Sequence, residues 1–212
     1  MRLAANHAVD RQAINESETL GLSKLTWSII PNHFEFYWQR LGYRYDPARA
    51  RQLLAEAGYP NGFDAGKYSC DTAFGSIGEA MVNYLQAAGI RAKLQPLERV
   101  AFFRAHSEKK HRGLIQEASV AFGNAATRIE AFVASGGAYA YGSYPDIDGT
   151  FREQATEAAP KRRGALLERQ LRSLEVSRSI VTPRRVRAVR SALGARASRR
   201  RCHAGSARAR PR

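Results

Sequence analysis

The sequence has few of the residues that build disulfide frameworks and metal centres. Its 212 residues include two cysteines, Cys70 and Cys202, which stand in unrelated contexts. The histidines show no spacing typical of metal ligands. They are His7, His33, His106, His111 and His203. We therefore expect neither a disulfide scaffold nor a bound metal.

Long apolar runs are missing as well. A membrane-spanning helix needs about 20 consecutive, mostly apolar residues, and the sequence contains no such stretch. Residues 1–10 also lack the continuous apolar core of a signal peptide. We therefore expect a chain that does not span a membrane and that contains no signal peptide.

Patterns that would indicate an enzyme are absent too. No glycine-rich phosphate loop precedes a predicted helix. Asp146 and Asp148 form a close carboxylate pair, but a position at the start of a helix explains them without catalysis. Cys70 lies at the end of a predicted strand, where a cysteine is more often a small buried residue than a nucleophile. His106 and His111 lie in a charged stretch and are predicted to be exposed. The sequence therefore predicts a protein that is not an enzyme and holds no cofactor.

Acidic residues almost disappear toward the end of the chain. Residues 171–212 hold 13 arginines and one acidic residue, Glu175, whereas residues 1–170 hold 21 basic and 18 acidic residues. Most of the formal net charge of +15 therefore belongs to this last segment. The segment also has no phenylalanine, tyrosine or tryptophan, so burial cannot offset the entropy cost of ordering it.

We accordingly divide the chain into a folded unit, residues 1–168, and an arginine-rich tail, residues 169–212, predicted to be disordered. The abrupt change in composition is also typical of GC-rich DNA read out of frame, with a frameshift between Glu168 and Leu174. The alternative is a genuine basic tail that binds nucleic acid or anionic lipid through its charge. A nucleic-acid binder usually carries basic surface on its folded domain, so the near-neutral folded unit makes nucleic acid the less favoured partner.

The clearest local signal is a helix that begins after Asp46 and ends before Gly58. Asp46 can cap the first turn, and Pro47 is favourable at the first helical position. Apolar residues then recur at helical spacing, and Gly58 followed by Pro60 ends the helix. The apolar positions are Ala50, Leu53, Leu54 and Ala57.

Strand and helix patterns alternate along the rest of the folded unit. Strands are predicted at residues 63–71, 90–95 and 114–122. Helices are predicted at residues 2–14, 76–89, 100–110, 127–133, from 145 onward, and 161–171. Two of them begin with capping boxes, Ser76 with Glu79 and Thr127 with Glu130. This alternation predicts an α/β lobe with a mixed or parallel sheet.

Aromatic residues gather between residues 16 and 45. They are Trp27, Phe34, Phe36, Tyr37, Trp38, Tyr43 and Tyr45. They have two interpretations, a wall facing a ligand or ordinary packing against the lobe. Packing is favoured, because aromatic side chains are commonly core or partly buried.

The predicted helix at 47–57 and its flanks also carry a family resemblance. The motif reads Tyr45-Asp46-Pro47, then Leu53-Leu54, then Ala57-Gly58-Tyr59-Pro60-Asn61-Gly62-Phe63. It resembles the C-terminal half of the extracytoplasmic solute-binding proteins of peptide-type (family 5) ABC importers. Residues 2–14 are similar to an interior helix of the same proteins, and the resemblance covers roughly residues 1–168.

This resemblance implies an incomplete α/β lobe of the periplasmic-binding-protein-like (type II) fold. In such proteins two lobes close on a ligand and deliver it to membrane permeases, with no bond made or broken. The resemblance implies a periplasmic location, a peptide or related small solute as ligand, and ABC permease subunits as partners. Because the large N-terminal portion of the family is missing from the sequence, we expect a truncated subunit with impaired binding.

The same resemblance singles out candidate ligand-binding residues. Peptide-binding relatives often carry, in the loop where Asn124 lies, an aspartate that pairs with the α-ammonium of the peptide. A neutral amide cannot make that charge-assisted bond, so a free peptide amino terminus is not expected as the recognised group. Phe122 and Asn124 are candidates for apolar and hydrogen-bond contacts. Arg128 either attracts an anionic ligand or is a solvated helix residue, and Tyr139 and Tyr141 are candidates for the border of the same cleft.

Overall fold

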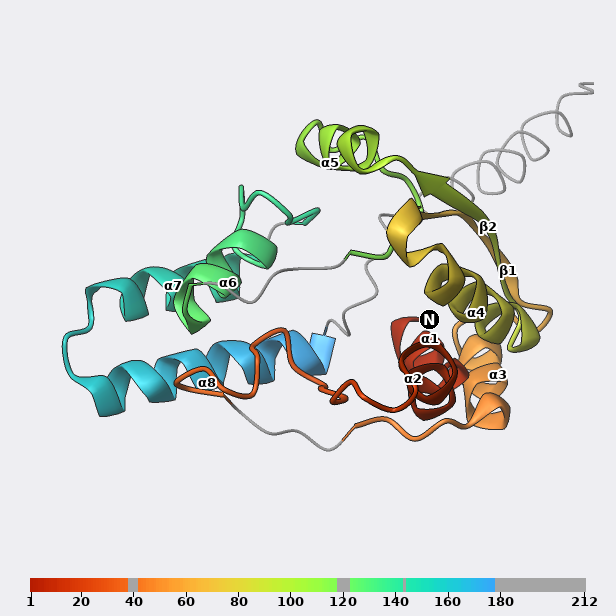
Figure 1. The fold of residues 1–212 in the computed structure, drawn as a ribbon. Helices are drawn as coiled ribbons and strands as arrows, with labels where there is room; N and C mark the ends of the chain where they lie inside the picture. The colour runs from red at the N-terminus through yellow and green to blue at the C-terminus, as the bar shows by residue number, and fades with distance from the viewer. Residues whose placement is uncertain (38–41, 118–122, 143, 178–212) are drawn as a thin grey trace, which may run out of the picture.

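The computed structural model describes residues 1–37, 42–117, 123–142 and 144–177, which form two bodies (Figure 1). The sheet body comprises α1 (Arg2–Ala8), α2 (Arg11–Thr19), α3 (Pro47–Glu56), β1 (Phe63–Asp71), a 3₁₀ turn (Thr72–Phe74), α4 (Gly75–Ala87), β2 (Ile90–Leu97), α5 (Arg99–Ser107) and β3 (Leu114–Ile115). The helical body comprises α6 (Ala125–Phe132), α7 (Pro145–Thr156) and α8 (Pro160–Ser177). The predicted disordered tail lies outside the described residues from 178 onward.

The three strands form one parallel sheet in the order β2-β1-β3. β1 is central, and Tyr68 is paired with Leu94 on one side and with Leu114 on the other. α4 connects β1 to β2 and packs against both, as the crossover between parallel strands requires. The predicted parallel α/β arrangement is therefore present. The third strand is assigned only at Leu114–Ile115 rather than 114–122, and its last five predicted residues lie outside the described part.

The turn into β1 depends on two glycines that lie against each other. The backbone N–H of Phe63 donates to the carbonyl oxygen of Gly89 at 3.0 Å, which joins the starts of β1 and β2. Gly62 and Gly89 have φ angles of 72° and 98°, a region that disfavours side chains. A Cβ added at Gly62 would lie 2.0 Å from the Gly89 carbonyl oxygen. This close approach requires glycine at position 62.

Gly62→Ala is therefore expected to destabilise the protein more than Gly58→Ala, its matched control. Both glycines have positive φ, 72° and 87°, so alanine costs about 1–2 kcal/mol at either position. Nothing lies within 4 Å of a Cβ at Gly58, whereas the backbone clash at Gly62 adds about 1–3 kcal/mol. Urea unfolding of both variants measures the difference, and equal losses would contradict the close approach.

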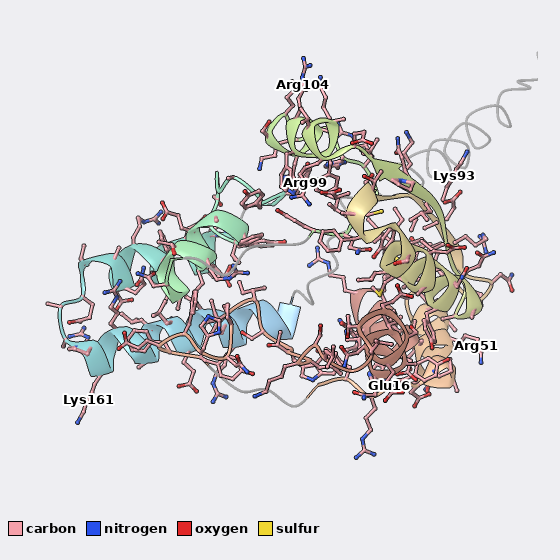
Figure 2. All side chains as sticks on the ribbon, in the orientation of Figure 1. Glu16, Arg51, Lys93, Arg99, Arg104 and Lys161 are labelled. Atoms are coloured by element: carbon pink, nitrogen blue, oxygen red, sulfur yellow. The ribbon has the colours of Figure 1, made fainter. Side chains whose placement is uncertain are left out.

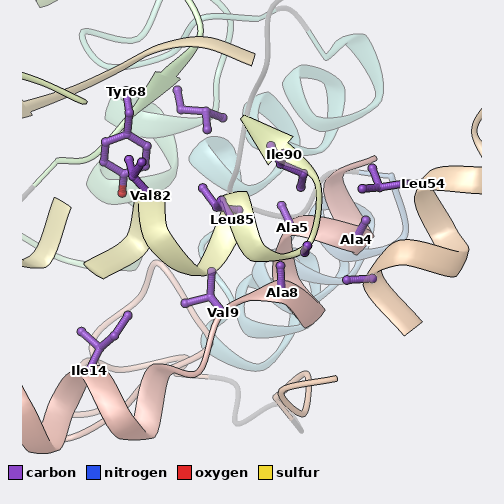
Figure 3. Close-up of a cluster of buried hydrophobic side chains, with 13 residues drawn as sticks. Ala4, Ala5, Ala8, Val9, Ile14, Leu54, Tyr68, Val82, Leu85 and Ile90 are labelled. Carbon is purple, nitrogen blue, oxygen red and sulfur yellow. The ribbon is translucent and has the colours of Figure 1, made fainter. Parts of the chain in front are cut away.

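The core of the sheet body is built from small residues of α1 against α3, α4 and the sheet (Figure 3). Its buried members are Ala4, Ala5, Ala8, Val9, Ile14, Ala50, Leu54, Tyr68, Val82, Leu85, Ala88, Ile90 and Leu114. Alanines on α1 and at Ala50 allow α1 and α3 to approach closely, and these two helices make one of the most extensive helix contacts of the structure. The predicted stripe of helix 47–57 thus supplies Ala50, Leu53 and Leu54 to this core, whereas Ala57 is exposed just past the end of α3.

The helical body has a separate core. Its buried members are Ile30, Ala125, Ile129, Val133, Ile147, Leu167 and Leu171. The segment that follows α2 runs alongside α8 (Figure 1), and Phe34, Phe36 and Tyr37 pack on this core. For these three aromatic residues, the packing interpretation is confirmed.

Two predicted helix starts are wrong. Ser76 does not cap α4, which begins one residue earlier at Gly75 without a side-chain cap. The 3₁₀ turn before it is capped by Asp71, whose Oδ1 accepts from the N–H of Ala73 at 3.0 Å. Thr127 does not cap α6 either, because Asn124 holds that position. In both cases the helix begins earlier in the sequence than the capping-box pattern predicts.

The predicted helix 2–14 is two helices. Val9 is extended, with φ −108° and ψ 123°, so α1 ends at Ala8. Asp10 then caps α2, its Oδ1 accepting from the N–H of Ala13 at 3.0 Å. By contrast, the predicted cap of α3 is confirmed, because Asp46 accepts from the N–H of Arg49 at 2.8 Å and Pro47 is the first helical residue.

The last described helix is longer than predicted. α8 spans Pro160–Ser177, so the proposed boundary at residue 168 falls inside it. α7 begins at the predicted Pro145, but Asp148 does more than favour the helix start, because it accepts hydrogen bonds from the N–H and the hydroxyl of Ser135. Within the described ranges, no helix is both long enough and apolar enough to cross a membrane.

Candidate ligand-binding site

The candidate site lies around the start of α6, where Asn124 is the N-terminal cap of the helix. Asn124 Oδ1 accepts from the N–H of Thr127 at 3.0 Å, and Thr127 Oγ1 accepts from the N–H of Asn124 at 2.9 Å. This reciprocal pair is a capping box. Asn124 is exposed, but its amide oxygen is already used by the helix. Phe122, the neighbouring candidate, lies outside the described residues.

Arg128 follows one turn later on α6 and is half-buried. Its Nε donates to the backbone oxygen of Ile29 at 2.6 Å, and its guanidinium lies 5.0 Å from the centre of the Phe132 ring. Burial lowers the pKa of Arg128, and the attraction of the Glu117 carboxylate opposes that shift. Arg128 therefore joins α6 to the segment after α2, and it is not a freely solvated helix residue.

Tyr139 and Tyr141 lie on the segment between α6 and α7, and both are half-buried. The Tyr139 ring stacks on Phe132 with centroids 4.8 Å apart and an interplanar angle of 22°. Both tyrosine rings also meet the edge of the His106 ring, at 5.2 Å and 5.1 Å between centroids. The Tyr141 hydroxyl donates to the backbone oxygen of His106 at 3.3 Å. The two candidates are thus brought together, by α5.

α5 is positioned by the sheet body. Arg99 Nε lies 3.1 Å from Oδ2 of Asp71, a side chain at the end of β1 that is 7% exposed. Figure 2 shows Arg99 on the side of α5 near the sheet, whereas Arg104 points away from it. Phe102 is 1% exposed on the inner face, and His106 follows it one turn later. The inner face of α5 therefore carries an aromatic and a histidine side by side.

Both histidines of this region are buried, which corrects the prediction that they are exposed. His106 is 2% exposed and His111 is 5% exposed. After α5 the chain reverses at Lys109, which has φ 53°. This turn returns His111 to Phe102, where His111 Nε2 lies 3.1 Å from the Phe102 backbone oxygen. Their polar neighbours in sequence belong to the outer face of α5 and to the turn that follows it.

His106 is paired with a carboxylate that the sequence did not single out. Its Nε2 lies 3.0 Å from Glu117 Oε2, and the two side chains are 3% and 14% exposed. Lys109 is the other unforeseen residue, because its Nζ donates to the backbone oxygens of Gly137, at 3.0 Å, and Ala138. Burial lowers the pKa of Lys109, against the attraction of Glu117. The four-residue spacing of Phe102 and His106 was the available signal for a shared helical face, whereas Lys109 follows the end of α5 and no helical spacing places it.

This arrangement can hold and orient groups through hydrogen bonds and ring contacts. Within the described residues, no group of three or more histidine, cysteine or acidic side chains could hold a metal ion. Cys70 is buried and its thiol pKa is raised, first by burial and then by Asp71. A raised pKa disfavours the nucleophilic thiolate, so the cysteine fits its predicted structural role.

The sequence model of the bacterial extracellular solute-binding proteins, family 5 (middle part), matches residues 1–155. The chain belongs to this family. The predicted resemblance to peptide-type solute-binding proteins is thereby confirmed. The family assignment covers the sheet body, α6 and nearly all of α7.

Curated relatives of this family 5 chain match shorter stretches. Heme-binding protein A of Haemophilus influenzae is 45% identical over 65 residues, which make up 30% of this chain and 12% of that protein. Glutathione-binding protein GsiB of Salmonella choleraesuis is 29% identical over 102 residues, 46% of this chain and 20% of that protein. The matched regions thus make up a small part of each relative.

Solved structures confirm the predicted periplasmic-binding-protein-like (type II) fold. The substrate-binding protein CtaP of Listeria monocytogenes matches with a TM-score of 0.74 at 19% identity, over 86% of this chain and 39% of that one. DppA of Helicobacter pylori, in complex with the peptide STSA, matches with a TM-score of 0.69 at 20% identity, over 82% of this chain and 35% of that one. At such identities the match shows the fold, and the family 5 chain spans well under half of either structure.

Proposed function

We propose that the chain is a periplasmic solute-binding component of an ABC importer, which takes up peptides or related small solutes and passes them to permease subunits. The family match over residues 1–155 carries this proposal. The names of the relatives support the ligand class, since DppA holds a peptide and the curated relatives are glutathione- and heme-binding proteins.

We further propose that the chain by itself is truncated and binds its ligand weakly or not at all. Aligned solved relatives extend well beyond it, since the matched region covers 35% of DppA and 41% of NikA of Brucella suis. Binding proteins of hinged construction hold their ligands between two lobes. A single lobe provides one side of such a site, so most of the contacts that exclude water are missing.

Phe122, Asn124, Arg128, Tyr139 and Tyr141 remain the proposed ligand contacts. Their charge sets the ligand class, because none of them is a carboxylate and Glu117, the nearby acid, is paired with His106. A free α-ammonium group would therefore enter the site without a counter-charge. We propose a ligand whose recognised end is neutral or anionic, with Arg128 as the group that attracts it.

A chimera separates the function from the truncation. Residues 1–155 replace the matching part of GsiB, and thermal unfolding of the chimera and of the 212-residue chain is followed with free and N-acetylated peptides, glutathione and heme. The chimera is expected to show a saturable rise in melting temperature, larger for acetylated than for free peptides, because a ligand stabilises the state that it binds. The chain alone is expected to show none.

Each arm has its own contrary result. A large, saturable shift for the chain alone would overturn the proposed impairment. A folded chimera that responds to no peptide or solute would overturn the proposed ligand class. A stronger response to free than to acetylated peptides would overturn the assignment of a neutral or anionic end.

A further inference from the structure

The sheet body and the helical body are connected next to α5 by a cluster of aromatic and titratable side chains. We call this cluster the histidine joint. Its members are Phe102, His106, Lys109, His111, Glu117, Tyr139 and Tyr141. The first five come from α5 and the chain that follows it, and the two tyrosines come from the helical body. Each body otherwise has its own apolar core, so the histidine joint is a distinct point of attachment.

The attachment consists of a few specific contacts with the segment 137–141. Lys109 Nζ donates to two backbone oxygens of that segment and lies 5.2 Å from the centre of the Tyr141 ring. The Tyr141 hydroxyl donates to the His106 backbone oxygen, and both tyrosine rings make T-shaped contacts with the His106 ring. The contacts of the two tyrosine rings depend on the position of the His106 ring.

The His106 ring has one nitrogen that a second proton would make unfavourable. Its Nε2 faces Glu117, but its Nδ1 is buried and has no hydrogen-bond partner among the described residues. A neutral ring leaves only a lone pair there. A doubly protonated ring would place an N–H donor at the same point, and a buried donor without an acceptor costs about 1–3 kcal/mol.

The positive charges near Glu117 limit how far its carboxylate can stabilise added protons on the two histidines. Lys109 and Arg128 are cations near Glu117, which is the carboxylate paired with His106. The His106 and His111 rings have centroids 5.6 Å apart, so each added proton brings like charges together. Glu117 opposes this effect, but its one carboxylate is shared among Lys109, Arg128, His106 and His111.

The direction in which the pKa of His111 is shifted agrees with these charges. Burial lowers the pKa of His111, the nearby His106 lowers it further, and the hydrogen bond to Phe102 and the Glu117 charge oppose both. A histidine whose folded pKa lies below its unfolded value contributes stability above about pH 6.5. That contribution is lost as the pH falls through the folded pKa.

We propose that the histidine joint is an acid-released attachment: protonation of its two histidines frees the segment 137–141 from α5. The freed segment carries Tyr139 and Tyr141 away from His106 and uncouples the helical body from the sheet body at this point. The release does not require a bound solute, so it holds or fails independently of the ligand class proposed above.

Hydrogen exchange of the full 212-residue chain tests the release. The N–H of Tyr139 donates to the backbone oxygen of Ala131 in α6 at 2.8 Å, so exchange of this amide reports how far the segment 137–141 loosens when its contacts with α5 are lost. Exchange is compared at about pH 7.5 and about pH 5.5, on either side of the ordinary histidine pKa, after correction for the intrinsic rates. Protection of residues 137–141 is expected to fall several-fold at the lower pH, the direction that a lowered His111 pKa in the attached form gives.

Four variants decide whether the histidines cause the loss. The double variant His106→Gln/His111→Gln cannot charge and is expected to keep equal protection at both pH values. His33→Gln, at an exposed histidine elsewhere, is expected to behave like the wild type. Lys109→Met removes the bonds to Gly137 and Ala138 and is expected to be unprotected at both pH values. If the double variant does not fold by circular dichroism, His111→Gln alone is used, with a smaller loss than in the wild type.

The contrary outcomes are as specific. Equal wild-type protection at both pH values would overturn the proposal. So would a double variant, or His111→Gln in its place, that loses protection as the wild type does. Full protection in Lys109→Met would show that the segment is held by other contacts.

Discussion

Phe102→Ala is expected to lower the free energy of unfolding by about 3–5 kcal/mol, the usual range for deleting a buried phenylalanine ring. Phe102 is 1% exposed, and its ring lies 4.8 Å from that of His111 and 6.0 Å from that of His106. Removal of the ring leaves a cavity next to two polar rings that lose their apolar cover. Urea unfolding at neutral pH measures the loss.

Val100→Ala on the same helix is the matched control. Val100 is 82% exposed, so its truncation is expected to change the stability by less than about 0.5 kcal/mol. Both changes place alanine, a good helix former, in α5, so helix propensity does not account for a difference between them. Comparable effects of the two substitutions would mean that the inner face of α5 is not packed.

Local sequence signals were sufficient to predict those helices and strands whose ends depend on hydrogen bonds between residues a few positions apart. The helix α3 was predicted with its cap Asp46 and its first residue Pro47 because each acts on backbone groups one turn away. The strand Phe63–Asp71 was predicted at its full length, between a glycine turn and the residues that lead into α4. In such cases the sequence pattern and the structure respond to the same short-range hydrogen bonds.

Local signals failed where two competing caps were close together. The pattern favoured Thr127 with Glu130, but Asn124 forms the actual cap and Thr127 is its partner. Asparagine is at least as good a cap as threonine, and the earlier start adds Ala125 to the buried core. Burial of Ala125 is a tertiary contribution, and the isolated sequence motif does not contain it.

The burial of His106 and His111 was not predictable from their neighbours in sequence. Three charged residues, Glu108, Lys109 and Lys110, lie between them, and these suggested a surface position. The residues that bury His106 include Tyr139 and Tyr141, more than 30 positions away, and their approach depends on how the helical body is placed. Contacts across such a distance need the fold, which the family resemblance supplied only in outline.

Glu117→Gln is expected to destabilise the protein by about 2 kcal/mol at neutral pH, since a hydrogen bond to a charged group is worth about 1.5–3 kcal/mol. The Glu117 side chain is 14% exposed, and its Oε2 accepts from His106 Nε2 at 3.0 Å. The amide keeps the shape but not the charge that faces Lys109 and Arg128. Thermal unfolding of the variant, with the exposed Glu79→Gln as the smaller-effect control, measures the loss.

A double-mutant cycle shows whether this loss belongs to the His106 pair. His106→Gln and Glu117→Gln are expected to couple by about 1–2 kcal/mol at neutral pH, as contacting residues do. If the two substitutions have additive effects on stability, Glu117 contributes through Lys109 and Arg128 and not through its pair with His106. Coupling matters for the proposed binding function because Glu117 follows β3 on the chain that leads to Asn124. Its pair with His106 ties this part of the chain to α5, next to Tyr139 and Tyr141, two of the proposed ligand contacts.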